Sequence, residues 1–228
     1  MNSILKIGHR GAKGHQPENT LISFQKAIDL KVDGIELDVH LSSDGEIIVI
    51  HDDTIDRTTN GKGEVNKMSL KELKSFLINN SQEIPTLIEV LNLVHKQCFI
   101  NIELKGIGTS KPVLDLISLY IKDKKWHYNN FLISNFDWKM LEEAQLLNPK
   151  IRIGVLTDAS VEDALAFAKK TKAFSIHPNY RLLTKENVAL MLENGFEVFP
   201  WTVNSFEDIQ KIKSFNVNGI ISDFPDRI

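Results

Sequence analysis

The sequence predicts an α/β fold in which eight short strands alternate with amphipathic helices around a parallel sheet. Short apolar runs of strand type recur along the 228 residues, and helical patterns separate them, which is typical of βα units. Eight such units close a (β/α)8 barrel. The strands are expected at residues 4–8, 33–39, 98–104, 130–134, 151–156, 173–176, 196–202 and 218–222. The helices are expected at residues 20–30, 86–96, 112–123, 137–147, 161–170, 185–194 and 205–214.

Length and composition favour one globular α/β domain over residues 1–228. Hydrophobic residues make up 42% of the chain and charged residues 25%, as in an ordinary globular protein. Lys and Arg number 27 against 30 Asp and Glu, so the net charge is -3. Because no basic field surrounds the molecule, we expect no nucleic-acid partner, and an anionic substrate must be bound locally. The oligomeric state stays open.

The cysteine content and the lack of long apolar runs indicate a cytoplasmic protein. Cys98 is the only cysteine, so no intramolecular disulfide can form, and its apolar neighbours predict a buried strand residue. The apolar stretch at residues 4–8 is too short for a signal peptide. No segment approaches the roughly 20 apolar residues of a membrane span, so we expect no stable membrane insertion.

A long insertion follows the second strand. Ser42–Glu46 is typical of a tight turn, and residues 47–50 extend the strand to His51. The next helix begins near residue 86, so residues 52–85 form an insertion, with a short helix at 69–74. In a barrel, an insertion at the carboxyl end of a strand usually belongs to the active site. The chain ends just past the eighth strand, so the last helix is expected to be truncated or missing.

Three acidic residues at two neighbouring strand ends predict a metal site. Glu36 and Asp38 stand two apart, so both carboxylates lie on one face of their strand. Glu103 ends the next barrel strand and adds a third carboxylate. A charged rim on an exposed edge would give the same pattern, but the apolar flanks favour a central strand. Oxygen ligands suit hard cations such as Mg²⁺ or Ca²⁺.

Basic residues and histidines also follow the strands. His9 and Arg10 come directly after the first strand, and His51 ends the extension of the second. Two histidines can divide acid–base work, because imidazole titrates near neutral pH. Arg10 and Lys105 can hold the oxygens of a phosphodiester. A packed histidine beside an exposed arginine is the alternative for the first pair.

These motifs, in this order along essentially the whole chain, resemble the glycerophosphodiester phosphodiesterase family, of the cytosolic bacterial type. The matching segments are Gly8-His9-Arg10-Gly11, Pro17-Glu18-Asn19-Thr20, Glu36-Leu37-Asp38-Val39, Asp44-Gly45, His51-Asp52 and Glu103-Leu104-Lys105. Later segments agree: Ser134-Asn135-Phe136-Asp137, Trp201-Thr202-Val203-Asn204 and Gly219-Ile220-Ile221-Ser222-Asp223-Phe224-Pro225.

The resemblance implies a TIM barrel with a small insertion and a small-molecule glycerophosphodiester substrate. It also implies one divalent cation, Mg²⁺, Ca²⁺ or Mn²⁺, that Glu36, Asp38 and Glu103 hold. His9 and His51 become the acid–base pair, and Arg10 and Lys105 contact the phosphate. By the same analogy the glycerol 2-hydroxyl attacks phosphorus, and water opens the resulting cyclic phosphate to glycerol 3-phosphate. Trp201 resembles an aromatic position at the glycerol end, although a core tryptophan is the alternative.

The remaining histidines match no catalytic motif. His40 shares the face of the two carboxylates and is expected to lie outside the set of metal ligands. His15, His95 and His127 are expected at the surface, while His177 either lines the barrel mouth or is structural.

Two other functions fit a barrel of this kind. One is a related phosphodiesterase or lyase that acts on lysophospholipids or sphingolipids, which would favour an apolar rim or an export signal. The other is a barrel that binds a phosphorylated ligand without turnover. Such a protein usually lacks a histidine or a carboxylate, whereas all of these positions are filled here.

Overall fold

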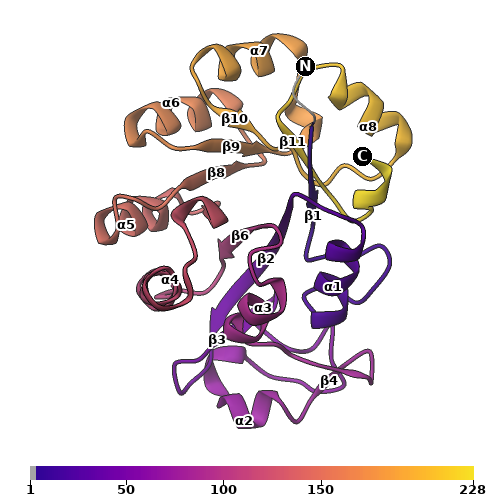
Figure 1. Cartoon of the computed structure of the whole chain (residues 1–228), viewed down its shortest axis with the longest axis vertical. Coiled ribbons are helices and arrows are strands. Elements are labelled where there is room, and N and C mark those ends of the chain that lie inside the picture. The colour runs from indigo at the N-terminus through magenta and orange to yellow at the C-terminus, as the bar shows by residue number, and fades with distance from the viewer. Residues whose placement is uncertain (1–3) are drawn as a thin grey trace.

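The computed structural model describes residues 4–228 and shows strands and helices in alternation around a central sheet (Figure 1). The strands of the main sheet are β1 (Leu5–Gly8), β2 (Gly34–Leu41), β3 (Ile47–Val49), β6 (Phe99–Leu104), β7 (Phe131–Asn135), β8 (Ile153–Thr157), β9 (Ser175–Pro178), β10 (Glu197–Val198) and β11 (Gly219–Ser222). The helices of the outer layer are α1 (Leu21–Asp29), α3 (Leu87–Val94), α4 (Ser110–Lys124), α5 (Trp138–Leu147), α6 (Val161–Thr171), α7 (Lys185–Glu193) and α8 (Phe206–Lys213).

Eight parallel strands close into a barrel. Their order is β10-β9-β8-β7-β6-β2-β1-β11. Two hydrogen bonds join the ends of this path: the Asn218 amide donates to the Val198 carbonyl at 3.2 Å, and the Ile221 amide donates to the Pro200 carbonyl at 2.9 Å. The predicted TIM barrel is therefore confirmed, with all eight strands in the expected segments. β10 is shorter than the predicted 196–202, and it stops before Pro200, which has no amide to donate to a ladder.

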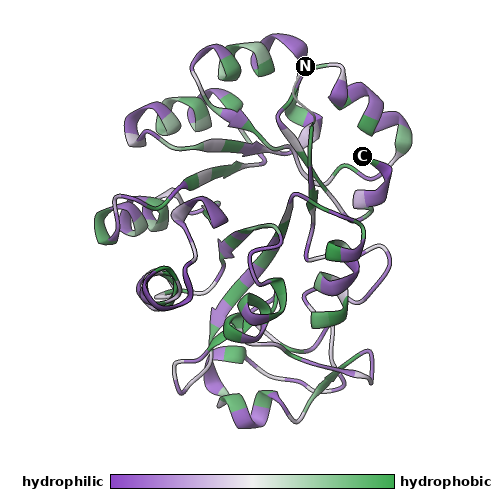
Figure 2. Cartoon of the chain, viewed as in Figure 1, coloured by the Kyte–Doolittle hydropathy of each residue, from purple (hydrophilic) through white to green (hydrophobic). Residues whose placement is uncertain are grey.

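Alternation along the strands divides apolar and polar side chains between the two sides of the sheet. Ile35, Leu37 and Val39 of β2 are buried in the layer between the sheet and the helices. That layer also holds Cys98, as predicted. The intervening side chains of β2 point into the barrel. Figure 2 shows hydrophobic and hydrophilic residues in alternation along β2.

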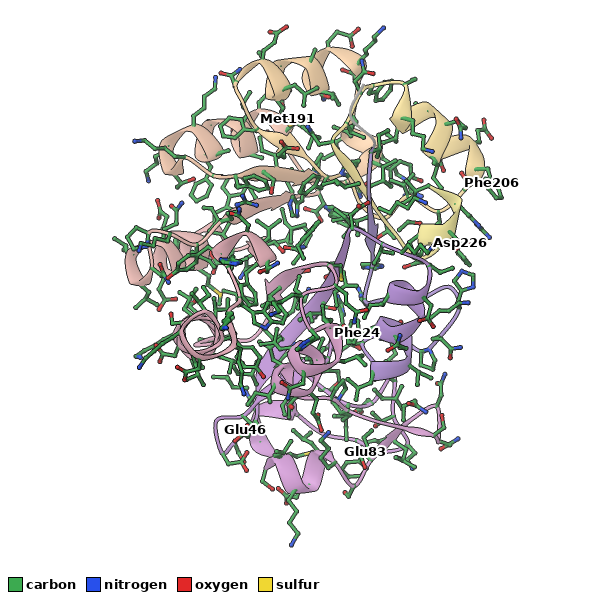
Figure 3. All side chains as sticks on the ribbon, in the orientation of Figure 1. Phe24, Glu46, Glu83, Met191, Phe206 and Asp226 are labelled. Atoms are coloured by element: carbon green, nitrogen blue, oxygen red, sulfur yellow. The ribbon has the colours of Figure 1, made fainter. Side chains whose placement is uncertain are left out.

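The helices also have buried side chains facing the sheet and exposed side chains facing solvent. Phe24 of α1 and Met191 of α7 are fully buried, whereas Phe206, in the first turn of α8, is 64% exposed (Figure 3). Thr184 and Ser205 cap α7 and α8, where their side chains accept hydrogen bonds from backbone amides.

The segment between β3 and α3 folds around an apolar cluster of its own. β3 pairs antiparallel with β2, and the chain then forms η1 (Val65–Lys67), α2 (Leu70–Leu73) and the hairpin β4 (Leu77–Ile78) and β5 (Gln82–Glu83). The short helix predicted at 69–74 corresponds to α2. The buried residues of this cluster are Ile48, Ile50, Ile55, Val65, Leu73, Ile78 and Ile84. The insertion is thus an ordered extension of β2 and β3.

Short 3-10 helices complete the fold, one of them at the end of the chain. After β11 the chain forms the 3-10 helix η4 (Pro225–Arg227), which stands where an eighth barrel helix would follow. The two other 3-10 helices are η2 (Tyr128–Asn130) and η3 (Tyr180–Leu182). Within residues 4–228, no helix has the length and apolar character needed to cross a membrane.

His177 lies inside the barrel wall and has a structural environment. It is fully buried, its Nε2 lies 2.8 Å from the Ser175 hydroxyl, and its ring packs 5.3 Å from the Phe199 ring centre. Gly154 leaves room for the ring, since a Cβ there would approach it to 2.6 Å. Burial lowers the pKa of His177 to about 3. The imidazole is therefore neutral in the folded protein.

This buried neutral histidine should make the fold sensitive to acid. Between about pH 6.5 and 3 the unfolded chain binds a proton at His177 that the folded chain does not, so the free energy of unfolding falls as the pH falls. We expect His177→Gln, which cannot titrate, to lose about 2 kcal/mol less than the wild type between pH 7 and pH 5. Urea unfolding at both pH values measures this difference. Equal losses would show that His177 contributes nothing to the acid sensitivity.

Candidate active site

A pocket at the carboxyl ends of the barrel strands is lined by several charged and polar side chains. The pocket has an empty volume of about 410 Å³. The lining residues are His9, Arg10, Glu36, His51, Asn101, Glu103, Lys105, Ser134, Phe136, Leu156, Trp201 and Ile221. Seven of the eight predicted site residues therefore lie together, and the eighth, Asp38, belongs to the carboxylate cluster beside them.

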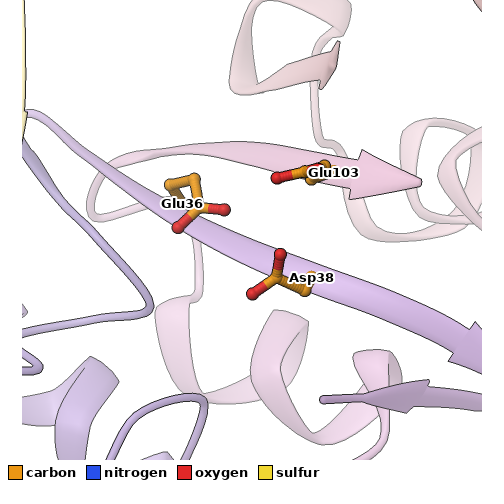
Figure 4. A group of neighbouring side chains, drawn as sticks. All are labelled: Glu36, Asp38 and Glu103. Carbon is orange, nitrogen blue, oxygen red and sulfur yellow. The ribbon is translucent and has the colours of Figure 1, made fainter. Parts of the chain in front are cut away.

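Glu36, Asp38 and Glu103 form a buried cluster of carboxylates. β2 and β6 are neighbours, with Asp38 opposite Glu103, so the three side chains come from adjacent positions. An oxygen of each lies within 4.8 Å of the others, and Figure 4 shows the groups directed into the space between the two strands. Burial, and then the charges of Asp38 and Glu103, raise the pKa of Glu36 well above its usual value. Burial and Asp38 likewise raise the pKa of Glu103 to about 7.

Two cations face this cluster. The Arg10 amide donates to Glu36 Oε2 at 2.8 Å, and its guanidinium Nε lies 3.4 Å from Asp38 Oδ2. Arg10 has a φ of 50°, and this left-handed turn directly after β1 directs both groups toward β2. Lys105 Nζ lies 3.1 Å from Glu103 Oε1 at the end of β6. Positive charge therefore borders the carboxylates on two sides of the pocket.

Each of the two pocket histidines is bound at Nδ1 by a carboxylate. His9 Nδ1 lies 2.6 Å from Asp223 Oδ1, and His51 Nδ1 lies 2.6 Å from Asp52 Oδ1. In residues 4–228 neither Nε2 has a hydrogen-bond partner, so the free nitrogen of each ring is available to a ligand. Burial lowers the pKa of both histidines, although the adjacent carboxylates act in the opposite direction. Such a carboxylate fixes the tautomer and the orientation of an imidazole.

Two aromatic side chains form an aromatic wall of the pocket. Trp201 and Phe136 meet edge to face, with their ring centres 5.4 Å apart. The Trp201 indole N–H donates to the His177 carbonyl at 2.8 Å, which fixes its orientation. Trp201 lines the pocket and also packs against the apolar cluster inside the barrel. The wall offers an apolar surface a short distance from the charged cluster.

Comparison with known proteins identifies the group to which this chain is related. The model of the glycerophosphoryl diester phosphodiesterase family matches residues 9–227. The chain belongs to this family.

Individual relatives span nearly the whole chain. A glycerophosphodiester phosphodiesterase of Caldanaerobacter subterraneus subsp. tengcongensis is 36% identical, over 98% of this chain and 96% of the relative. A phosphodiesterase of Oleispira antarctica, whose structure was solved with the product sn-glycerol-3-phosphate, superposes with a TM-score of 0.88 at 28% identity. That superposition covers 97% of this chain and 94% of the other. A glycerophosphodiester phosphodiesterase of Thermotoga maritima superposes with a TM-score of 0.83 at 29% identity, over 99% of this chain and 97% of the other.

Family membership confirms two predictions made from the sequence. The chain is an enzyme of the glycerophosphodiester phosphodiesterase class, and its barrel is the barrel of that family. The carboxylate cluster also suits the divalent cation expected in this family. Asp38 Oδ1 and Asn101 Oδ1 are buried without a hydrogen-bond partner among the described residues, so oxygen donors remain free at the cluster. Three carboxylates of this kind form a ligand set for a hard cation.

Several residues that support the active site were not predicted from the sequence. Asp223 holds His9 and itself accepts a hydrogen bond from Asn204 at 2.7 Å. Its segment contributed to the resemblance, but 214 positions separate it from His9, and only the pairing of β1 with β11 joins them. Glu18 and Arg57 were likewise given no role, although both contact residues of the site.

The other histidines lie outside the pocket, as expected. His15, His95 and His127 are exposed at the surface, and His15 lies beside Asp226. His40 is buried, and its Nε2–H donates to the His51 carbonyl at 3.1 Å, so it supports the backbone next to the site.

The carboxylate cluster leads to a prediction about metal binding. Because deprotonating Glu36 beside Asp38 and Glu103 costs free energy, Glu36→Gln should unfold at the same or a higher temperature than the wild type in chelator. A cation at 100 times its Kd should stabilise the wild type by about 2.7 kcal/mol, and the variant by much less. Thermal unfolding with and without Mg²⁺, Ca²⁺ or Mn²⁺ measures both effects.

Glu64→Gln provides the control for this prediction, since Glu64 is an exposed carboxylate paired with Lys67 in the insertion. This control should gain as much from the cation as the wild type. Equal gains in Glu36→Gln would exclude Glu36 as a ligand.

Proposed function

We propose that the chain hydrolyses glycerophosphodiesters to glycerol 3-phosphate and an alcohol, with His9 and His51 as the acid–base pair. Two histidines with carboxylate-bound Nδ1 atoms lie in one pocket beside three clustered carboxylates, and this observation carries the proposal. The product-bound structure of the Oleispira antarctica relative supports glycerol 3-phosphate as the product.

Each charged residue has a distinct task in this reaction. Arg10 and Lys105 bind the non-bridging oxygens of the phosphodiester. Glu36, Asp38 and Glu103 hold one divalent cation, Mg²⁺, Ca²⁺ or Mn²⁺, which when bound polarises those oxygens. One histidine accepts the proton of the attacking hydroxyl at Nε2, and the other donates a proton from Nε2 to the departing oxygen. Asp52 and Asp223 keep both rings oriented with Nε2 toward the substrate.

The aromatic wall suits the glycerol end of the substrate. Trp201 and Phe136 present apolar ring surface to the pocket, and carbon-bound hydrogens of a polyol pack against such surfaces. The glycerol 2-hydroxyl would then lie close to phosphorus, in position to attack it before water opens the cyclic phosphate.

We propose that residues 1–228 act as one domain. The cytoplasmic location and the absence of a nucleic-acid partner stay predictions from the sequence.

The first experiment is an assay of glycerol 3-phosphate release from glycerophosphocholine and glycerophosphoethanolamine. The purified protein is treated with chelator, and Mg²⁺, Ca²⁺ or Mn²⁺ is then restored. Release that stops with chelator and returns with metal would support both the reaction and the cofactor. If neither substrate yields glycerol 3-phosphate with any of the three metals, the proposal is wrong.

The histidine assignments predict a large loss of activity without unfolding. His9→Ala and His51→Ala should each lower kcat by at least about 100-fold, the usual contribution of a general acid or base. His15→Ala is a matched control, because His15 also pairs with an aspartate, Asp226 at 2.6 Å, but lies outside the pocket. The control should keep wild-type turnover. Near-wild-type activity in either pocket variant would refute its assignment.

A lysophospholipid is the second candidate substrate. Phe136 lines the pocket and is 39% exposed, and Ile107, two residues after Lys105 of the pocket, is 96% exposed, so apolar side chains are exposed on two loops at this end of the barrel. Choline release from lysophosphatidylcholine separates the two substrate classes, because cleavage of that diester gives choline and an acylated glycerol phosphate. Hydrolysis of the lysolipid alone would favour this second function.

A further inference from the structure

Arg57, in the insertion, binds two carboxylates at the edge of the pocket. Its Nε and Nη2 donate to Asp52 at 2.7 and 3.0 Å, and its Nη2 and Nη1 donate to Glu18 at 2.7 and 3.0 Å. Both carboxylates are therefore held by two hydrogen bonds each. A guanidinium can do this because its donors form a planar fork, whereas an ammonium is a single point of charge.

Each of these carboxylates in turn holds a residue of the pocket. Glu18 Oε1 accepts a hydrogen bond from Arg10 Nη1 at 2.7 Å, and Asp52 Oδ1 lies 2.6 Å from His51 Nδ1. The contacts form one continuous chain from Arg10 through Glu18, Arg57 and Asp52 to His51. Arg57 is its centre, and it is the member contributed by the interior of the insertion.

The burial of these groups indicates what the central arginine does. The Glu18 side chain is only 10% exposed, and hydrogen bonds from Arg57 and Arg10 hold the pKa of its carboxyl far below the usual range in spite of burial. The Arg57 side chain is 48% exposed. Solvent therefore reaches the guanidinium, while the carboxylate that it holds is shielded. A fork that connects two site residues through two carboxylates fixes their orientation in addition to whatever it contributes to folding.

The local structure fixes where Arg57 emerges. Ile55, two residues earlier, is fully buried in the apolar cluster of the insertion, and its amide donates to the Gly63 carbonyl at 3.0 Å. Asp56 accepts a hydrogen bond from the Gly63 amide at 2.8 Å. Two hydrogen bonds to Gly63, across the loop, thus hold the backbone just before Arg57. The insertion can therefore hold the guanidinium in one place.

We propose that Arg57 is a positioning residue that orients Arg10 through Glu18 and His51 through Asp52. The insertion thereby positions the group that binds the phosphate together with one of the groups that transfer protons. This inference rests on the proposed function of Arg10 and His51. It assigns to the insertion a direct part in building the site.

The test compares Arg57→Ala and Arg57→Lys with the wild type in the glycerophosphocholine assay at saturating metal. Loss of a partner that orients site residues costs roughly 10- to 100-fold in activity, and we expect Arg57→Ala to lose this much in kcat/KM, with effects on both kcat and KM. Arg57→Lys should recover only a small part, because one ammonium cannot bridge four oxygens. Added guanidinium should raise the activity of Arg57→Ala, since the half-exposed site is open to a small cation.

A double-mutant cycle distinguishes positioning from a separate structural effect. If Arg57 acts on His51 through Asp52, adding Arg57→Ala to Asp52→Asn should lower kcat much less than Arg57→Ala lowers it alone. Lys67→Ala is the matched control, because Lys67 forms an exposed ion pair with Glu64 in the same insertion. It should keep wild-type activity.

The outcomes separate this inference from the proposed function. An inactive wild type would refute the proposed function, and the role of Arg57 with it. An active wild type with Arg57→Ala within about threefold of its kcat/KM, or with fully additive losses in the cycle, would refute the role of Arg57 alone.

Discussion

The close approach of Glu36, Asp38 and Glu103 is the constraint on which the rest of the site depends. Two ionised groups 4.8 Å apart repel by roughly 3 to 4 kcal/mol at an effective dielectric constant of 20, so three together cannot stay charged without compensation. Arg10 and Lys105 supply two positive charges at the cluster. A divalent cation would bring the total to one net positive charge. This net charge of the site is equal and opposite to the single negative charge of a phosphodiester. The charge balance therefore favours this substrate over a dianionic phosphate.

The barrel makes such an arrangement possible by separating packing from chemistry along each strand. On β2, one set of alternate residues, Ile35, Leu37 and Val39, is buried against the helices and contributes to the free energy of folding. The other set turns Glu36 and Asp38 toward β6. Parallel pairing fixes the register of β2 and β6, so the Cα positions that carry the three carboxylates are set by the sheet. The repulsion among them is therefore opposed by the pairing of these strands.

The sequence predicts features that depend on short-range pattern. The spacing of Glu36 and Asp38 is enough to place both on one face, and Thr184 and Ser205 cap helices through contacts within four residues. Features that depend on closure of the barrel could not be predicted in this way. Asp223 reaches His9 only because the last strand pairs with the first. Arg57 reaches Glu18 only because the insertion folds on its own apolar cluster, and no local pattern specifies that direction.

The two histidines consequently depend on different parts of the molecule. His9 is held by Asp223 on the closing strand of the barrel, so its orientation is as stable as the sheet itself. His51 is held by Asp52 and, one contact further, by Arg57 of the insertion. The insertion has a smaller apolar cluster than the barrel and can open locally at a lower free energy. Local opening would then break the contacts of Arg57 with Asp52 and Glu18, while His9 and the three carboxylates stay in place on the barrel.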